Sequence, residues 1–174
     1  MPKIIENIRE KLLEEAKRQV MEQGYATMTI RSVASACGVG VGTVYNYFAS
    51  KDMLVASFML EDWLICKQAI DLGCGEGNTI ELALRHIYDG LNSFIAKYER
   101  LFKDESAGAA FASSSKQHHK ILCKQIAEPL LPFCQEQTSV KAEFLAAFVA
   151  ESMLTWVCSE CSYEDISSVL LQLF

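Results

Sequence analysis

The chain has 174 residues, 51% of them apolar and 22% charged, with a formal net charge of −6. This composition is typical of a globular protein with a sizeable core and excludes an intrinsically disordered chain. The longest apolar run, Phe144 to Ala150, is too short to span a membrane, and the first residues lack the apolar core of a secretion signal. We therefore expect a cytoplasmic protein.

Acidic residues are concentrated in the C-terminal two thirds of the chain. Residues 1–60 contain seven Lys or Arg and six Asp or Glu, a net charge of +1, whereas residues 61–174 contain nine and sixteen, a net charge of −7. The overall acidity therefore does not exclude a nucleic-acid partner at the N-terminal end, where binding would depend on a few well-placed cations and on salt.

Helical periodicity runs through the chain, because apolar residues recur at intervals of three and four. The fold class predicted is all-α, with about nine helices. Five helices are expected at residues 2–23, 30–36, 40–48, 51–72 and 79–100. A short helix is expected within 101–115, and another is expected to start near 115 and to be stopped by Pro129 and Pro132. The last two helices are expected at 140–157 and 162–174.

The stretch from Thr29 to Asp52 predicts two short helices joined by a turn. Thr29 is a good N-cap for the first, and Gly38 stands where the chain needs a positive φ to leave it. The second helix is apolar at Val44 and Phe48. Such a pair is typical of a helix-turn-helix, whose second helix lies in the DNA major groove, and equally of a helical hairpin inside a larger bundle.

Residues 8–58 resemble the N-terminal DNA-binding domain of the TetR family of one-component transcriptional regulators. The matching residues are Gly24-Tyr25, Thr29-Ile30, Val33-Ala34, Gly38-Val39, Gly42-Thr43-Val44-Tyr45-Asn46-Tyr47-Phe48 and Ser50-Lys51. The chain departs from the family at Gly40 and Val41, where a Ser and a basic or polar residue are usual, and at Asn46, where His is frequent. Glycine in place of the Ser weakens the helix cap by a few tenths of a kcal/mol.

The resemblance implies a DNA-binding domain at residues 1–49 and an effector-binding and dimerisation domain at 50–174. In the family, the matching positions read bases or hold phosphates. Bases are assigned to Val41, Thr43 and Tyr45, and phosphates to Thr29, Tyr45, Asn46, Tyr47 and Lys51. Arg31, near the start of the second helix, is an additional candidate for the DNA backbone.

Residues 140–157 are apolar on nearly every side, so this helix must be covered on more than one face. A core helix in a monomer would satisfy that requirement. Pairing of the last two helices with their copies, as a four-helix bundle, satisfies it too and is favoured by the resemblance. The predicted homodimer interface contains Phe144, Phe148, Met153, Val169, Leu170 and Leu173.

Aromatic residues are spread through the C-terminal two thirds, and some are expected to line an apolar cavity between helices. The resemblance implies a pocket there for a small apolar effector, whose identity differs between family members. The candidate pocket residues are Phe58, Trp63, Tyr88, Phe94, Phe102 and Phe111.

The sequence gives little support for a metal, redox or catalytic site. Cys158 and Cys161 form a C-x-x-C with no second ligand pair nearby, and Glu160 between them would raise a thiol pKa. His118 and His119 are adjacent, so on a helix they point about 100° apart and cannot jointly face one metal. We expect both histidines to be polar surface or pocket-rim residues, and we expect no metal site, no cofactor and no enzyme.

The sequence thus favours a homodimeric, ligand-responsive regulator, a repressor of a palindromic operator on double-stranded DNA, released by a small molecule. Two alternatives stay open. One is a thiol-based redox or metal protein using Cys158 and Cys161. The other is an adaptor of the same fold that does not bind DNA, which Gly40 and Val41 would support.

Overall fold

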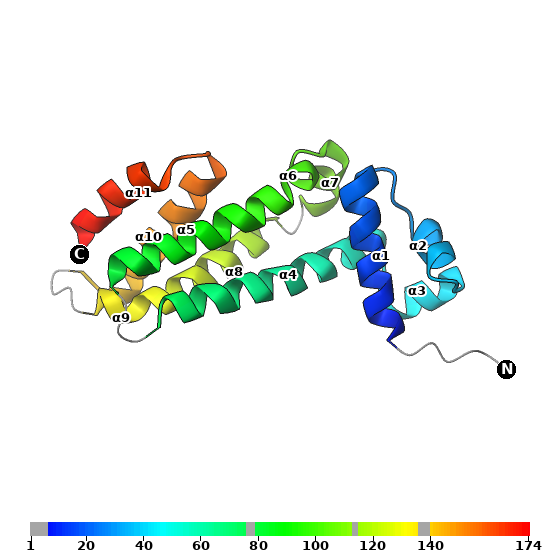
Figure 1. Ribbon diagram of the computed structural model, residues 1–174, viewed down its shortest axis with the longest axis horizontal. Coiled ribbons are helices and arrows are strands. Elements are labelled where there is room, and N and C mark those ends of the chain that lie inside the picture. The colour runs from blue at the N-terminus through cyan, green and yellow to red at the C-terminus, as the bar shows by residue number, and fades with distance from the viewer. Residues whose placement is uncertain (1–6, 76–78, 113–114, 136–139) are drawn as a thin grey trace. The chain divides into compact units, whose positions relative to one another are not determined.

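The computed structural model describes residues 7–75, 79–112, 115–135 and 140–174 (Figure 1). Over these ranges the chain forms helices and no strands, which confirms the predicted all-α class. The helices are α1 (Ile8–Gln23), α2 (Ile30–Ala36), α3 (Val41–Tyr47), α4 (Lys51–Gly73), α5 (Ile80–Lys97), α6 (Glu99–Phe102), α7 (Glu105–Phe111), α8 (Ser115–Ala127), α9 (Leu131–Cys134), α10 (Ala142–Cys158) and α11 (Tyr163–Leu170), with 3-10 turns at Glu128–Leu130 and Leu171–Leu173. The described helices outnumber the nine expected because α6 and α9 are separate four-residue helices.

Packing divides the chain into two compact units. The N-terminal unit consists of the described residues up to Asp62 together with those from Tyr98 to 112, and the C-terminal unit consists of Trp63–Lys97 and the described residues from 115 to Phe174. The division runs through α4. It does not test the functional boundary after residue 49, which stays a prediction, because compactness does not reveal which residues bind a ligand.

In the N-terminal unit, α1 packs on α2 and α2 packs on α3 (Figure 1). One face of α1 is apolar and is buried at Leu12, Ala16 and Val20. The start of α1 was expected at Pro2, which lies outside the described residues. Within them α1 begins at Ile8, because Asn7 has a left-handed backbone (φ 59°) that cannot continue a right-handed helix.

The helices α6 and α7 complete the core of the N-terminal unit. The fully buried Tyr98 stacks on Phe58, with ring centroids 6.2 Å apart, and its hydroxyl donates to Asp62 at 2.5 Å. The helix expected at 79–100 therefore ends earlier, at Lys97. Tyr98 leaves helical geometry (φ −107°, ψ 14°), and a separate short helix follows.

The C-terminal unit is built around α10, which packs on α5, α8 and α9, while α11 packs on α5. One face of α10 supplies the centre of its core. The buried residues of α10 are Leu145, Ala146, Val149, Ala150, Met153, Leu154 and Val157. Gly90 of α5 allows a close approach to α4, because Cys66 Sγ donates to its carbonyl at 3.3 Å and an added Cβ would lie 2.8 Å from Ile70 Cγ1.

Within the described ranges, no helix combines the length and the apolar character that a membrane crossing requires.

Candidate nucleic-acid interface

The start of α2 is fixed by a reciprocal pair of hydrogen bonds. Thr29 is the N-cap, as predicted, and its Oγ1 accepts from the Ser32 backbone N–H at 3.0 Å. The Ser32 Oγ accepts from the Thr29 N–H at 3.1 Å, which completes a capping box. Ser32 Oγ also lies 2.6 Å from Oε1 of Gln19, a buried polar residue of α1. The cap therefore also fixes α2 against α1.

The turn between α2 and α3 has the geometry expected of Gly38. Its φ is 68°, in the left-handed region that glycine adopts without a steric penalty. The Gly38 N–H donates to the Ser35 carbonyl at 3.1 Å, and the Val39 N–H donates to the Ala34 carbonyl at 2.9 Å. These bonds satisfy carbonyls at the end of α2, so the chain turns within a few residues into α3.

The helix α3 buries one side and exposes the other. The two apolar positions noted in the sequence are covered, Val44 fully and Phe48 nearly so, whereas about half of the surface of Tyr45 and Tyr47 is accessible. Asn46 and Gly42 are also exposed, and an added Cβ at Gly42 would meet nothing within 4 Å. The uncovered face of α3 is therefore polar and aromatic, with a gap in side chains at Gly42.

All eight predicted DNA contacts lie in the N-terminal unit, at the start of α2, along α3 and at the start of α4. Arg31 is exposed. The Lys51 ammonium is instead occupied within the unit, because its Nζ donates to the Tyr25 carbonyl at 2.5 Å and lies 4.0 Å from the Tyr25 ring centroid. Burial lowers the pKa of Lys51. The assigned roles stay predictions.

Several other cations of the N-terminal unit are paired with carboxylates. Arg9 pairs with Glu61 and Lys17 with Asp62, each at 2.7 Å. Arg18 pairs with two glutamates of its own helix. Paired charges contribute little long-range positive potential, so a phosphate partner of this unit must be held by few cations, in line with the net charge of only +1 on residues 1–60.

The six candidate pocket residues belong to both units, three to each. In the C-terminal unit, Trp63 and Phe94 are brought together edge to face at 5.5 Å, and the Trp63 Nε1–H donates to Gln125 at 2.7 Å. Tyr88 packs against Tyr163 at 5.5 Å.

In the N-terminal unit, Phe58 is buried, Phe111 packs against Tyr25, and Phe102 is exposed. The effector pocket stays a prediction for all six residues.

The six predicted interface residues also divide by burial. Phe144, Phe148 and Val169 are 68%, 48% and 52% exposed, whereas Met153 and Leu170 are fully buried within the single chain. Leu173 is half-buried. A fully covered side chain has no surface left for a second copy, so of these six residues Phe144, Phe148 and Val169, with part of Leu173, are the ones available for such an interface.

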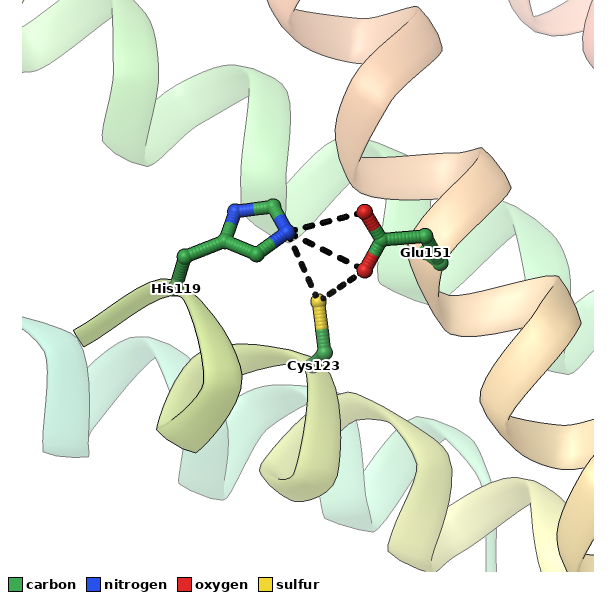
Figure 2. Close-up of side chains that lie close together, drawn as sticks. All are labelled: His119, Cys123 and Glu151. Carbon is green, nitrogen blue, oxygen red and sulfur yellow. Dashed lines mark hydrogen bonds and ion pairs between the residues drawn. The ribbon is translucent and has the colours of Figure 1, made fainter. Parts of the chain in front are cut away.

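The C-x-x-C cysteines form no disulfide with each other. Cys158 is exposed as a residue, but neighbouring protein atoms partly desolvate its thiol and raise its pKa, which makes it a poor nucleophile. The structure instead brings together three residues that sequence reasoning did not combine. His119 and Cys123 of α8 meet Glu151 of α10 (Figure 2). His119 and Cys123 are four residues apart, so the sequence could have placed them on one face of a helix. Nothing in the sequence indicated that Glu151 lies beside them.

Comparison with known proteins identifies the segment that carries α2 and α3. Residues 12–58 match the family model described as "Bacterial regulatory proteins, tetR family". Over 51 residues the chain is 39% identical to the HTH-type transcriptional regulator HbdR of Aromatoleum sp. (strain CIB), a match covering 29% of this chain and 22% of HbdR. It is 28% identical over 54 residues to UidR of Escherichia coli (strain K12), covering 31% of this chain and 28% of UidR. The matches thus span under a third of these curated relatives.

The structural likeness extends over most of the chain. The TetR-family transcriptional repressor FadR of Thermus thermophilus, solved in complex with lauroyl-CoA, aligns with a TM-score of 0.64 and 20% identity over 95% of this chain and 92% of that chain. The fold is thus that of helix-turn-helix proteins with a helical C-terminal unit. Within that class, residues 12–58, which carry α2 and α3, are similar to the TetR family of bacterial regulatory proteins.

Proposed function

We propose that the chain is a ligand-responsive transcriptional repressor that binds a palindromic DNA operator as a homodimer in the cytoplasm. The observation that supports this most directly is the α2–turn–α3 pair, with its capping box at Thr29, its left-handed Gly38 and the uncovered polar face of α3. The DNA major groove accommodates an α-helix that is packed on its own domain along one side and exposed along the other.

The proposed contacts divide into base and backbone contacts. Val41 and Thr43, in the first turn of α3, would face base edges, with Tyr45 reaching bases or phosphates. Arg31 and Lys51 would face phosphates, together with the neutral donors of Thr29, Asn46 and Tyr47. Because few cations take part, few counterions are released, so the slope of log affinity against log salt should be shallow, with the highest affinity at low ionic strength.

A dimer is proposed from the exposed apolar side of the last two helices. Phe144 and Phe148 are one turn apart on α10, and Val169 is exposed on α11. Large exposed phenyl groups at helical spacing are typical of a protein interface, and a two-fold axis lets each copy cover the other. Such a dimer would present two α3 helices about 34 Å apart, one turn of DNA.

An apolar effector is proposed as the releasing signal. FadR of Thermus thermophilus, which shares this fold, was solved with lauroyl-CoA, an acyl ligand. In this chain the edge-to-face contact of Trp63 with Phe94, with the polar Gln125 beside it, supports the proposal of an apolar site in the C-terminal unit. Converting a mostly bound repressor to a mostly released one needs about 10⁴-fold preference for the released form, about 5.5 kcal/mol.

Selection of duplexes from a random pool by the purified full-length chain, at low ionic strength, tests the proposal. We expect enrichment of a palindrome whose half-sites are one helical turn apart, bound by two copies in light scattering. A scrambled version of the enriched duplex is the control. Failure to enrich any sequence, or enrichment of a single half-site by a monomer, would overturn the proposal.

A further inference from the structure

Outside the DNA-binding face, three side chains with metal-ligating atoms converge on one point of the C-terminal unit. His119 and Cys123 project from successive turns of α8, and Glu151 projects from α10 toward them (Figure 2). Their ligand atoms all lie within 4.8 Å of one another. α8 and α10 pack directly on each other, so the cluster is held by two neighbouring helices and not by a loop.

The distances within the cluster are short and reciprocal. His119 Nε2 lies 2.9 and 3.0 Å from the two carboxylate oxygens of Glu151. Cys123 Sγ lies 3.5 Å from His119 Nε2 and donates to Glu151 at 2.9 Å. Each of the three groups therefore contacts both of the others.

These spacings are close to those of a tetrahedral metal centre. With a zinc–nitrogen bond of about 2.0 Å and a zinc–sulfur bond of about 2.3 Å, two ligands at the tetrahedral angle are about 3.5 Å apart. The observed His119–Cys123 separation is 3.5 Å. The Glu151 oxygens would need to withdraw by about 0.5 Å to reach the matching distance. Its side chain is 54% exposed, so rotation can supply that shift.

The donor set decides the class of ion. One imidazole nitrogen, one thiolate and one carboxylate suit zinc and its borderline neighbours, whereas magnesium and calcium require oxygen ligands. His119 and Glu151 are about half exposed, so the ion has access from solvent and a water can complete the coordination. Cys123 packs against the apolar core and anchors the inner side of the site.

We propose that His119, Cys123 and Glu151 bind one divalent ion of the zinc class, with a fourth position left to water. Binding forms the metal–sulfur bond as the Cys123 S–H bond breaks, and the thiol proton passes to solvent. The imidazole takes the tautomer protonated at Nδ1, so the Nε2 lone pair is free for the metal. The ion joins α8 to α10. This site is independent of the DNA-binding proposal.

Titration of the reduced, chelator-treated full-length chain with Co²⁺, followed by displacement with Zn²⁺, tests the proposal. We expect one Co²⁺ per chain, with the near-ultraviolet charge-transfer absorption of a cobalt–thiolate bond and the visible spectrum of tetrahedral cobalt. Cys123→Ser should abolish the thiolate band. Glu151→Gln and His119→Asn should weaken binding by at least about tenfold, since loss of a ligand costs more than loss of the partner groups that orient one.

Two matched controls make the assignment specific. His118→Asn removes the neighbouring histidine, and Cys158→Ser removes an exposed cysteine of the C-x-x-C; both should leave the cobalt spectrum unchanged. Glu151 is exposed, so Glu151→Gln keeps the test valid if Cys123→Ser unfolds, which circular dichroism would show. Absence of a thiolate band in the unaltered chain, or its loss in Cys158→Ser, would overturn the proposal.

Discussion

The helices α3 and α10 both leave one side uncovered, with opposite kinds of side chain. α3 buries Val44 and exposes Asn46, Gly42 and two tyrosines, whereas α10 buries Val149 and Met153 and exposes Phe144 and Phe148. Polar groups and tyrosine hydroxyls exchange water for phosphates and base edges at little cost. Transfer of exposed phenyl rings out of water lowers the free energy, and contact with another protein surface provides that transfer. The contrast predicts a nucleic-acid partner for one helix and a protein partner for the other.

The largest effect is expected at α10. Phe148→Glu would place one carboxylate from each copy in the proposed interface, and burying unpaired charges should weaken the dimer by more than about 3 kcal/mol, over a hundredfold. Light scattering across a dilution series measures the change. Phe102→Glu, at a similarly exposed phenylalanine of the N-terminal unit, is the matched control and should stay dimeric. A Phe148→Glu dimer of unchanged strength would remove α10 from the interface.

A smaller effect is expected on the other side of the comparison, at Thr43 of α3. Thr43→Ala should remove about 1–3 kcal/mol of discrimination at one base position while leaving affinity for a scrambled duplex unchanged. Titration of duplexes that differ at single positions measures this. An equal loss on the operator and on the scrambled duplex would mean that Thr43 does not read bases.

Arg31 should act uniformly across sequences. Arg31→Ala removes one phosphate contact, so the slope of log affinity against log salt should fall by about one for every duplex. Arg85→Ala, the same charge change at an exposed arginine of the C-terminal unit, is the control and should leave the slope unchanged. Lys51→Ala should resemble Arg31→Ala in slope, but it also removes the contact with Tyr25. A slope unaffected by Arg31→Ala would exclude its phosphate contact.

The smallest effect is expected at Gly42. Alanine there meets open space and favours the helix, so Gly42→Ala should raise the free energy of unfolding by about 0.5–1 kcal/mol. Gly90→Ala is the contrasting variant, because its Cβ would lie 2.8 Å from Ile70 Cγ1 and should destabilise the fold. Denaturant titration measures both. Destabilisation by Gly42→Ala would show that the outer side of α3 is covered within the protein.

Local features of the fold could be predicted from sequence because they depend on a few neighbouring residues. Thr29 caps α2 through Ser32, three residues away, and Gly38 turns the chain by its own backbone freedom. The end of α5 could not be predicted, since helical periodicity continues past Lys97 and the break reflects the burial of Tyr98 in a different unit.

Features that depend on tertiary packing were harder to predict. An all-round apolar pattern does not reveal which side a domain covers itself, so Met153 was grouped with Phe148 although one is buried and the other half exposed. The cluster of His119, Cys123 and Glu151 depends on the register of α8 against α10, across 28 residues of chain. No local rule connects such positions.

The contact of Tyr98 with Phe58 means that the N-terminal unit is not one continuous stretch of chain. Residues 98–112, which follow α5 in the sequence, complete the core of this unit, and Phe111 among them packs against Tyr25. A fragment ending at Asp62 would contain the whole helix-turn-helix. It would lack Tyr98 and Phe111, so the rings of Phe58 and Tyr25 would be exposed to water. A fusion of that fragment to another helical bundle would therefore have an incomplete hydrophobic core, unless the bundle supplied a substitute for α6 and α7.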